Sequence, residues 1–167
     1  MSGKNEIRSY DYVNHPYERV RRALESDPAA VFSAATRAAA SRAQSVASEL
    51  RVNVAGLDVG ARINVSVGEI EQRPREAPAG PATRIPVRWE AATRPYLFPF
   101  MSAELSIYPL TTTETQLDFL GRYEPPLGAV GGAVDAVVGH RIAEASVHRF
   151  LSDVAAYLRR SLEAERA

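Results

Sequence analysis

The sequence predicts an α+β fold in which an antiparallel sheet is covered on one face by helices. Three observations predict this fold. Two helix-like segments follow a short first strand, the middle of the chain alternates apolar and polar residues, and no proline follows position 126. Alternation with a period of two is typical of strands that are buried on one face only. The chain has 167 residues and no visible linker, so we expect residues 1–167 to form a single domain.

The first part of the chain is expected to form a strand and two helices. The segment EIRSYDYVN reads as a short strand, after which Asn14 is expected as an N-cap and Pro16 in the first helical turn. The first helix is expected over Tyr17–Leu24. Asp27 followed by proline is a second helix start, and the alanine-rich residues Ala29–Ala47 carry apolar side chains at helical spacing.

Five strands with short connections are expected next. The segment PREAPAGPAT is a predicted loop, and Pro86 favours an edge or strand-start position. Because each strand has one polar face, the predicted helices must cover the other face. The apolar positions of the five strands are Leu50, Val52 and Val54; Ile63, Val65 and Val67; Ile85, Val87, Trp89 and Ala91; Met101, Ala103, Leu105 and Ile107; and Leu117, Phe119 and Tyr123.

The C-terminal segment predicts a long helix with two different halves. Leu127 to Glu163 contains no proline, but the glycine-rich GAVGGAVDAVVGH precedes the bulky VHRFLSDVAAYL. The small-residue half either closes on the sheet at native packing density or leaves a void beneath it. We expect one arc of the helix to face the sheet. This arc consists of Ala129, Ala133, Ala136, His140 and Ala143, followed by Val147, Phe150, Leu151, Val154 and Leu158.

Two stretches carry a family resemblance: IRSYDYVNHPYERVRRALES and GRYEPPLGAVGGAVDAVVGHRIAEASVHRFLSDVAAYLRR. With five strands between them, their order resembles the START/SRPBCC superfamily, which includes plant pollen-allergen proteins and aromatic polyketide cyclases. The resemblance covers element order and hydrophobic pattern over nearly the whole chain, without a catalytic motif. It implies a helix-grip fold, in which a curved antiparallel sheet wraps around the long C-terminal helix and encloses a hydrophobic cavity. Members bind lipids, sterols, polyketides or hormones, and a minority catalyse cyclisation or dehydration.

Composition and motifs argue against several other functions. Twenty basic residues balance twenty acidic ones, so a nucleic acid or an anionic membrane is not indicated as a partner. The chain has no cysteine, HxxxH or HExxH, and we expect no metal and no cofactor. The glycines of GAVGG do not form a GxGxxG nucleotide loop. The chain carries no apolar secretory core and no run of spanning length, so a cytoplasmic location without integral membrane association is expected.

The candidate site residues are those expected to face the space between the sheet and the last helix. Each has a plainer interpretation as core packing. His140 alone among the three histidines points with the inner arc, so it is the candidate acid/base, or else a histidine satisfied at the core edge. His15 is expected to be exposed, and His148 lies on the polar arc. The predicted cavity wall consists of Trp89, Met101, Leu105, Phe119, Tyr123, Ala133, Ala136 and His140.

Three hypotheses for function follow. The first is a protein that binds a hydrophobic small molecule (a lipid, a polyketide or another aromatic or isoprenoid-like ligand) in the cavity. The second is an enzyme of the polyketide cyclase/dehydratase kind, which uses the same cavity. The third is a homodimeric interaction module without a ligand. It is suggested by the apolar residues Val130, Val134, Val138 and Ile142 on the opposite face of the last helix.

Overall fold

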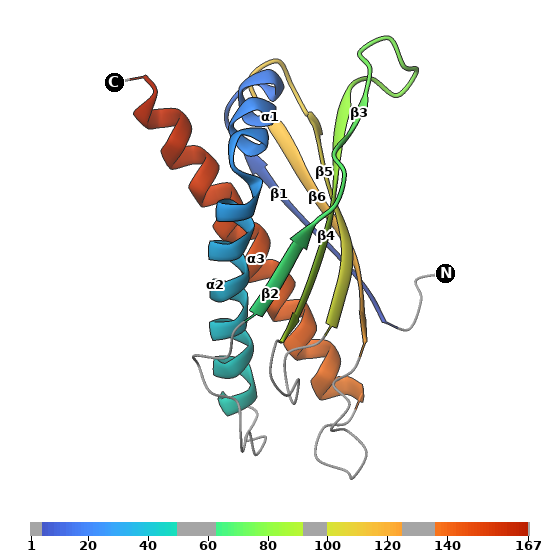
Figure 1. The fold of residues 1–167 in the computed structure, drawn as a ribbon, viewed down its shortest axis with the longest axis vertical. Coiled ribbons are helices and arrows are strands. Elements are labelled where there is room, and N and C mark those ends of the chain that lie inside the picture. Colours follow the sequence, from blue (N-terminus) through green and yellow to red (C-terminus); the bar gives the residue numbers. More distant parts are fainter. Residues whose placement is uncertain (1–4, 50–62, 92–99, 125–135, 167) are drawn as a thin grey trace.

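The computed structural model describes residues 5–49, 63–91, 100–124 and 136–166, which form one sheet and three helices (Figure 1). The predicted strand around Leu50–Val54 lies outside the described residues. The elements in chain order are β1 (Glu6–Val13), α1 (Tyr17–Ser26), α2 (Pro28–Glu49), β2 (Ile63–Val67), β3 (Glu71–Arg73), β4 (Ala82–Ala91), β5 (Phe100–Pro109), β6 (Thr115–Glu124) and α3 (Ala136–Ala164).

The strands form one antiparallel sheet in the order β1-β6-β5-β4-β2, and β3 also pairs with β4. The long helix α3 crosses one face of this sheet, and α2 lies beside α3 (Figure 1). Residues of β6 alternate between buried and partly or fully exposed side chains, as a sheet covered on one side requires. The predicted α+β helix-grip fold, with two shorter helices after the first strand, is therefore confirmed.

The start of α1 corrects one prediction, while the start of α2 confirms another. Pro16 is the N-cap of α1, and no side chain caps this end, so Asn14 does not have the predicted role. Because Pro16 has an extended backbone and its carbonyl accepts hydrogen bonds from the first helical amides, the helix begins without a capping side chain. At α2, a carboxylate oxygen of Asp27 accepts a hydrogen bond from the Ala30 amide at 3.2 Å, as predicted.

The two longest helices pack against each other, and the buried face of α2 carries Phe32 together with small side chains. Ala35, Ala39 and Ala43 are fully buried and recur every four residues, so they lie on one face of the helix. Small side chains let two helix axes approach closely, and α2 accordingly packs mainly against α3. The alanine-rich composition of this segment is thus explained by packing between helices.

Pro86 lies in the middle of β4, where the sequence predicts an edge or strand-start position. β4 pairs with β2 up to Val67↔Val87 and with β3 from Glu71↔Arg84. From Val67 to Glu71 the chain advances four residues, while β4 advances three residues between the paired positions Arg84 and Val87. One extra residue opposite a continuous strand is the arrangement of a β-bulge. The carbonyl of Pro86 accepts a hydrogen bond from the Gly68 amide at 2.9 Å, while its nitrogen, which has no hydrogen, faces the break between β2 and β3. The interrupted partner makes this central position behave locally as an edge.

Candidate functional site

The inner face of the sheet brings five of the predicted wall residues together. Trp89, Met101 and Tyr123 form one row across β4, β5 and β6, because the register pairs Trp89 with Met101 and Met101 with Tyr123. Leu105 lies opposite Phe119 in a second row. All five side chains are buried. Ala133 lies outside the described residues, and the side chain of Ala136 is likewise not described.

Between the sheet and the helices, the described interior contains a block of aromatic rings. Phe150 of α3 lies 4.9 Å from the ring of Trp89 and 5.6 Å from that of Phe119, measured between centroids. On its α2 side, Phe150 stacks on Phe32 at 5.8 Å. None of these four side chains is more than 1% exposed. At this level the second half of α3 is packed onto the sheet through its bulky residues, as the sequence predicts for that half.

One polar pair interrupts this apolar interior. The hydroxyl of Tyr123 and the Nδ1 of His140 are 3.1 Å apart, and they join the end of β6 to the second turn of α3. Tyr123 is 4% exposed, and burial raises the pKa of its phenol. His140 is half-buried. The phenol therefore stays neutral near pH 7 and acts as a hydrogen-bonding group.

The Tyr123–His140 pair lies at one end of the interior between the sheet and α3. β4 and β6 finish at this end, while β5 and α3 begin there, as Figure 1 shows. The aromatic block around Phe150 lies further along α3, beyond the small side chain of Ala143. Among the predicted wall residues, Tyr123 and His140 thus form a hydrogen-bonded pair at the margin of the packed interior.

The small-residue row of the inner face lies between the two bulky rows. Gly121 pairs with Ala103, and a Cβ atom at Gly121 would come within 2.7 Å of the Met101 sulfur and 2.8 Å of the Phe119 ring. Both distances are shorter than real Cβ contacts, so these two side chains lean into the space that the glycine leaves. Any larger residue here would displace the sulfur and the ring.

The other two histidines lie away from this pair. His148 is exposed, as predicted. His15 is only 2% exposed, so the expectation that it is exposed is wrong. Its carbonyl accepts a hydrogen bond from the hydroxyl of Thr115 at 2.8 Å, which holds the β1–α1 junction against β6. Burial, followed by the nearby charges of Arg19 and Arg166, lowers the pKa of the imidazole.

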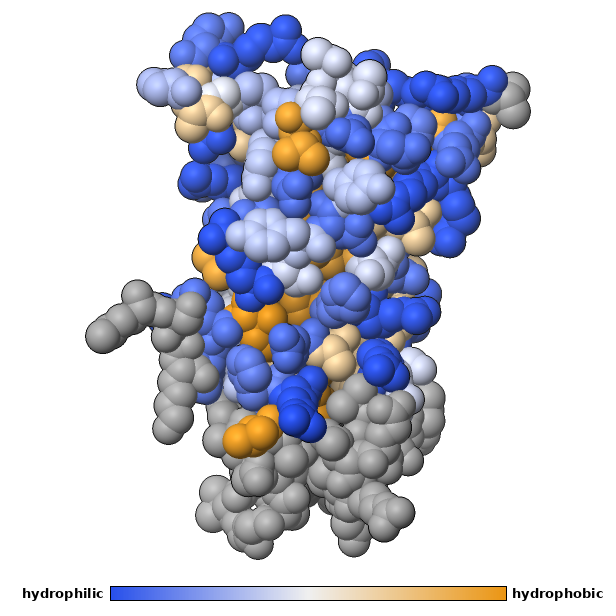
Figure 2. Space-filling model, turned by 180° about the vertical axis from the view of Figure 1, so that it is seen from behind, coloured by the Kyte–Doolittle hydropathy of each residue, from blue (hydrophilic) through white to orange (hydrophobic). Residues whose placement is uncertain are grey.

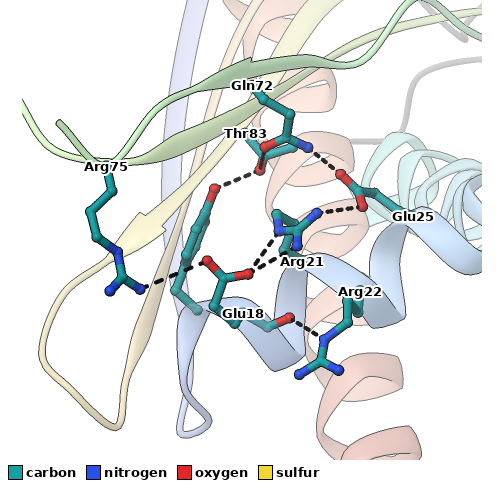
Figure 3. A network of polar contacts seen from close by, with 8 residues as sticks. Glu18, Arg21, Arg22, Glu25, Gln72, Arg75 and Thr83 are labelled. Carbon is teal, nitrogen blue, oxygen red and sulfur yellow. Dashed lines mark hydrogen bonds and ion pairs between the residues drawn. The ribbon is translucent and has the colours of Figure 1, made fainter. Parts of the chain in front are cut away.

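A second polar cluster links α1 to β3 and β4, and Figure 3 shows its members. The hydroxyls of Tyr17 and Thr83 are 2.7 Å apart, and Thr83 donates to the amide oxygen of Gln72 at 2.8 Å. Gln72 in turn hydrogen-bonds Glu25, which forms an ion pair with Arg21 at 2.9 Å. These side chains satisfy one another, so we interpret the cluster as a structural link. Local sequence patterns give no signal for it, because its residues on α1 are more than 40 positions away from those on β3 and β4.

The described residues form neither a metal-binding cluster nor a helix that could span a membrane. Across these parts of the chain, no group of three or more His, Asp or Glu side chains lies close enough to hold a metal ion. None of the helices in the described segments is long and apolar enough to cross a membrane. For the dimer hypothesis, Val130 and Val134 lie outside the described residues, and Ile142 is 2% exposed, within the core of its own chain.

Fold and site together define a helix-grip protein with a polar pair at one end of an apolar interior. No family model and no curated protein matches the chain. Solved structures similar to it include the Zhui aromatase/cyclase from Streptomyces sp. R1128, with 14% identity, a TM-score of 0.46 and 94% of each chain covered. A conserved protein from Geobacillus kaustophilus has 16% identity and a TM-score of 0.47, with 93% of this chain and 96% of that chain covered.

The chain is also similar to BexL, a di-domain ARO/CYC from the BE-7585A biosynthetic pathway. Here the identity is 7% and the TM-score 0.43, and the match covers 94% of this chain and 50% of that chain. The assignment of the fold itself rests on the element order and sheet topology described above.

Proposed function

We propose that the protein binds a hydrophobic small molecule at the Tyr123–His140 end of the space between the sheet and α3. One observation carries this proposal: a buried phenol and a half-buried imidazole, 3.1 Å apart, face the interior at the margin of an aromatic core. Burying polar groups costs free energy unless they are hydrogen-bonded, and such convergent groups in an apolar wall are typical of ligand pockets. The pair would anchor a carbonyl or hydroxyl of an otherwise apolar ligand.

The test begins with the purified protein. Native mass spectrometry, followed by organic extraction, should detect an apolar molecule that co-purifies. A thermal-shift panel of lipids and aromatic polyketides should then identify compounds that raise the melting temperature. For such a compound, Tyr123→Phe removes one hydrogen bond and should weaken binding about tenfold.

The matched control is Tyr10→Phe, because Tyr10 is 50% exposed and its ring lies beside Arg8 on the other face of the sheet. This variant should bind like the unaltered protein. The proposal is wrong if no apolar compound co-purifies or stabilises the protein. It is also wrong if Tyr123→Phe and Tyr10→Phe bind every stabilising compound equally well.

The same pair supports a second candidate, a cyclase- or dehydratase-type reaction. An imidazole next to a neutral phenol provides a base and a hydrogen-bond donor within reach of one another. In such a reaction, His140 would accept a proton from a carbon next to a carbonyl, and the phenol of Tyr123 would stabilise the enolate oxygen. Full turnover by a His140→Ala variant on any substrate found by the binding screen would contradict this candidate.

A further inference from the structure

The face of the sheet turned away from the helices carries several arginines, four of which are Arg8, Arg84, Arg88 and Arg122. The register places Glu6, Arg122, Ser102, Arg88 and Ser66 in one row across five strands. Neighbouring positions of an antiparallel row have Cβ atoms about 4.5–5.5 Å apart. The hydroxyl of Ser102 is therefore flanked by Arg122 on one side and Arg88 on the other. Arg8 and Arg84 belong to other rows of the same face.

These four arginines differ in their partners. Arg8 forms a two-pronged ion pair with Asp118, with distances of 3.1 and 2.8 Å, and Arg84 lies 3.8 Å from Glu104. Within the described part of the chain, neither Arg88 nor Arg122 lies within 4.0 Å of a carboxylate oxygen. The guanidinium groups of Arg88 and Arg122, on either side of the Ser102 hydroxyl, thus keep hydrogen-bond donors available for a ligand.

The two arginines with available donors also line a hollow in the surface. It has a volume of about 490 Å³, and Arg88, Ser102, Arg122 and Phe100 contribute to its wall. A second hollow of about 320 Å³ adjoins it and shares Arg88 and Phe100. The guanidinium of Arg88 lies 5.7 Å from the centre of the Phe100 ring. Figure 2 shows one face of the molecule, on which hydrophilic residues predominate and hydrophobic residues are visible between them.

The carboxylates of the hollow restrict the charge of a ligand. Glu6 and Glu124 line it together with the two arginines, so its formal charge is balanced. Glu6 and Glu124 repel a dianion such as phosphate more strongly than a monoanion, and one carboxylate group can accept hydrogen bonds from Ser102 and both guanidiniums. The Phe100 ring offers a surface for a flat apolar group.

We infer that this hollow is a second ligand site, which binds an organic monocarboxylate between Arg88 and Arg122 with its apolar body against Phe100. The hollow opens on the face of the sheet turned away from α3, because Ser102 and Met101 point to opposite faces of β5, and Tyr123 near the end of β6 also borders it. It needs no ligand in the interior, and the proposed function does not depend on it.

The experiment is an NMR titration with benzoate that follows the side-chain Nε–Hε signals of the arginines. Signals of Arg88 and Arg122 should shift in a saturable way, while the methyl signal of Met101 in the interior should stay in place. Benzamide, which has the same shape without charge, and inorganic phosphate should each bind at least about tenfold more weakly. Arg122→Gln should weaken benzoate binding to a similar extent, again about tenfold.

Arg84→Gln is the control variant, because Arg84 occupies the same face but lies next to Glu104. It should bind benzoate like the unaltered protein. Three results would overturn the inference: no saturable shift at Arg88 and Arg122, equal affinity for benzoate and benzamide, or equal losses in Arg122→Gln and Arg84→Gln. A shift of the Met101 methyl without one at the two arginines would assign benzoate to the interior and likewise overturn it.

Discussion

Replacing Phe150 with alanine tests whether the interior at this level is packed or open. The sequence leaves both outcomes possible, and the structure places the ring between Trp89, Phe119 and Phe32 with no exposed surface. In a packed core, removing a phenylalanine side chain loses its transfer free energy and leaves a cavity. In an open pocket, the side chain lines existing space, so no new cavity is created.

The expected cost can be worked from these contacts. Phenylalanine-to-alanine changes in cores lower the free energy of unfolding by about 3–5 kcal/mol. Three aromatic rings within 5.8 Å hold the walls of the site apart and prevent collapse, so we expect about 4 kcal/mol. For a domain of this size, about 2–4 °C per kcal/mol corresponds to a melting temperature lower by about 8–16 °C. This is a large share of a typical total stability of about 5–15 kcal/mol.

Urea unfolding followed by tryptophan fluorescence is a suitable assay, because Trp89 is the single tryptophan and its ring lies 4.9 Å from that of Phe150. The control is Val137→Ala on the same helix, whose side chain is 64% exposed. This change should alter the free energy of unfolding by no more than about 0.5 kcal/mol. A loss below about 1.5 kcal/mol for Phe150→Ala, the lower end of the transfer term alone, would refute the packed interior.

Three further changes test other parts of the fold. Asp27→Ala removes the cap of α2 and should lower the free energy of unfolding by about 1 kcal/mol, measured by urea unfolding; no change would contradict the capping role. Gly121→Val should cost about 1–3 kcal/mol in the same assay, because its side chain overlaps the Phe119 ring; a neutral result would mean that the ring moves freely. Because burial lowers the folded-state pKa of His15, stability should be constant above about pH 6.5 and fall below it, as the unfolded chain takes up the proton first. His15→Gln should reduce the pH dependence of the free energy of unfolding below about pH 6.5. An unchanged pH dependence would exclude His15 as its source.

Most of the fold could be predicted from the sequence because its signals are local. Alternation with a period of two marks β5 and β6, and Asp27 followed by Pro28 marks the start of α2. The exceptions depend on partners far away in the chain. Pro86 can lie within β4 only because its neighbour is interrupted at Gly68, and no pattern around Pro86 itself shows this.

The candidate site divides in the same way. Helical spacing places His140 on the arc that faces the sheet, and alternation places Tyr123 on the inner face of β6. Their hydrogen bond spans 17 residues and depends on the angle at which α3 crosses the sheet, which periodicity does not determine. The burial of His15 was missed for a related reason, because residues near the far end of α3 lie against a helix start that looks exposed in the sequence.

The polar side chains of the interior differ in whether their hydrogen bonds are already used within their own helix. Ser146 is buried on α3, but its hydroxyl donates to the carbonyl of Ile142 in its own helix at 2.7 Å, so its proton is already used. Thr36 on α2 likewise donates to the carbonyl of Phe32. In the Tyr123–His140 contact one group donates a hydrogen bond to the other. The phenol and the imidazole have further donor and acceptor positions that this contact does not use. This pair therefore offers hydrogen-bonding groups to a polar atom of a ligand between the sheet and α3, whereas Phe150 on α3 and Phe119 on β6 offer apolar contact.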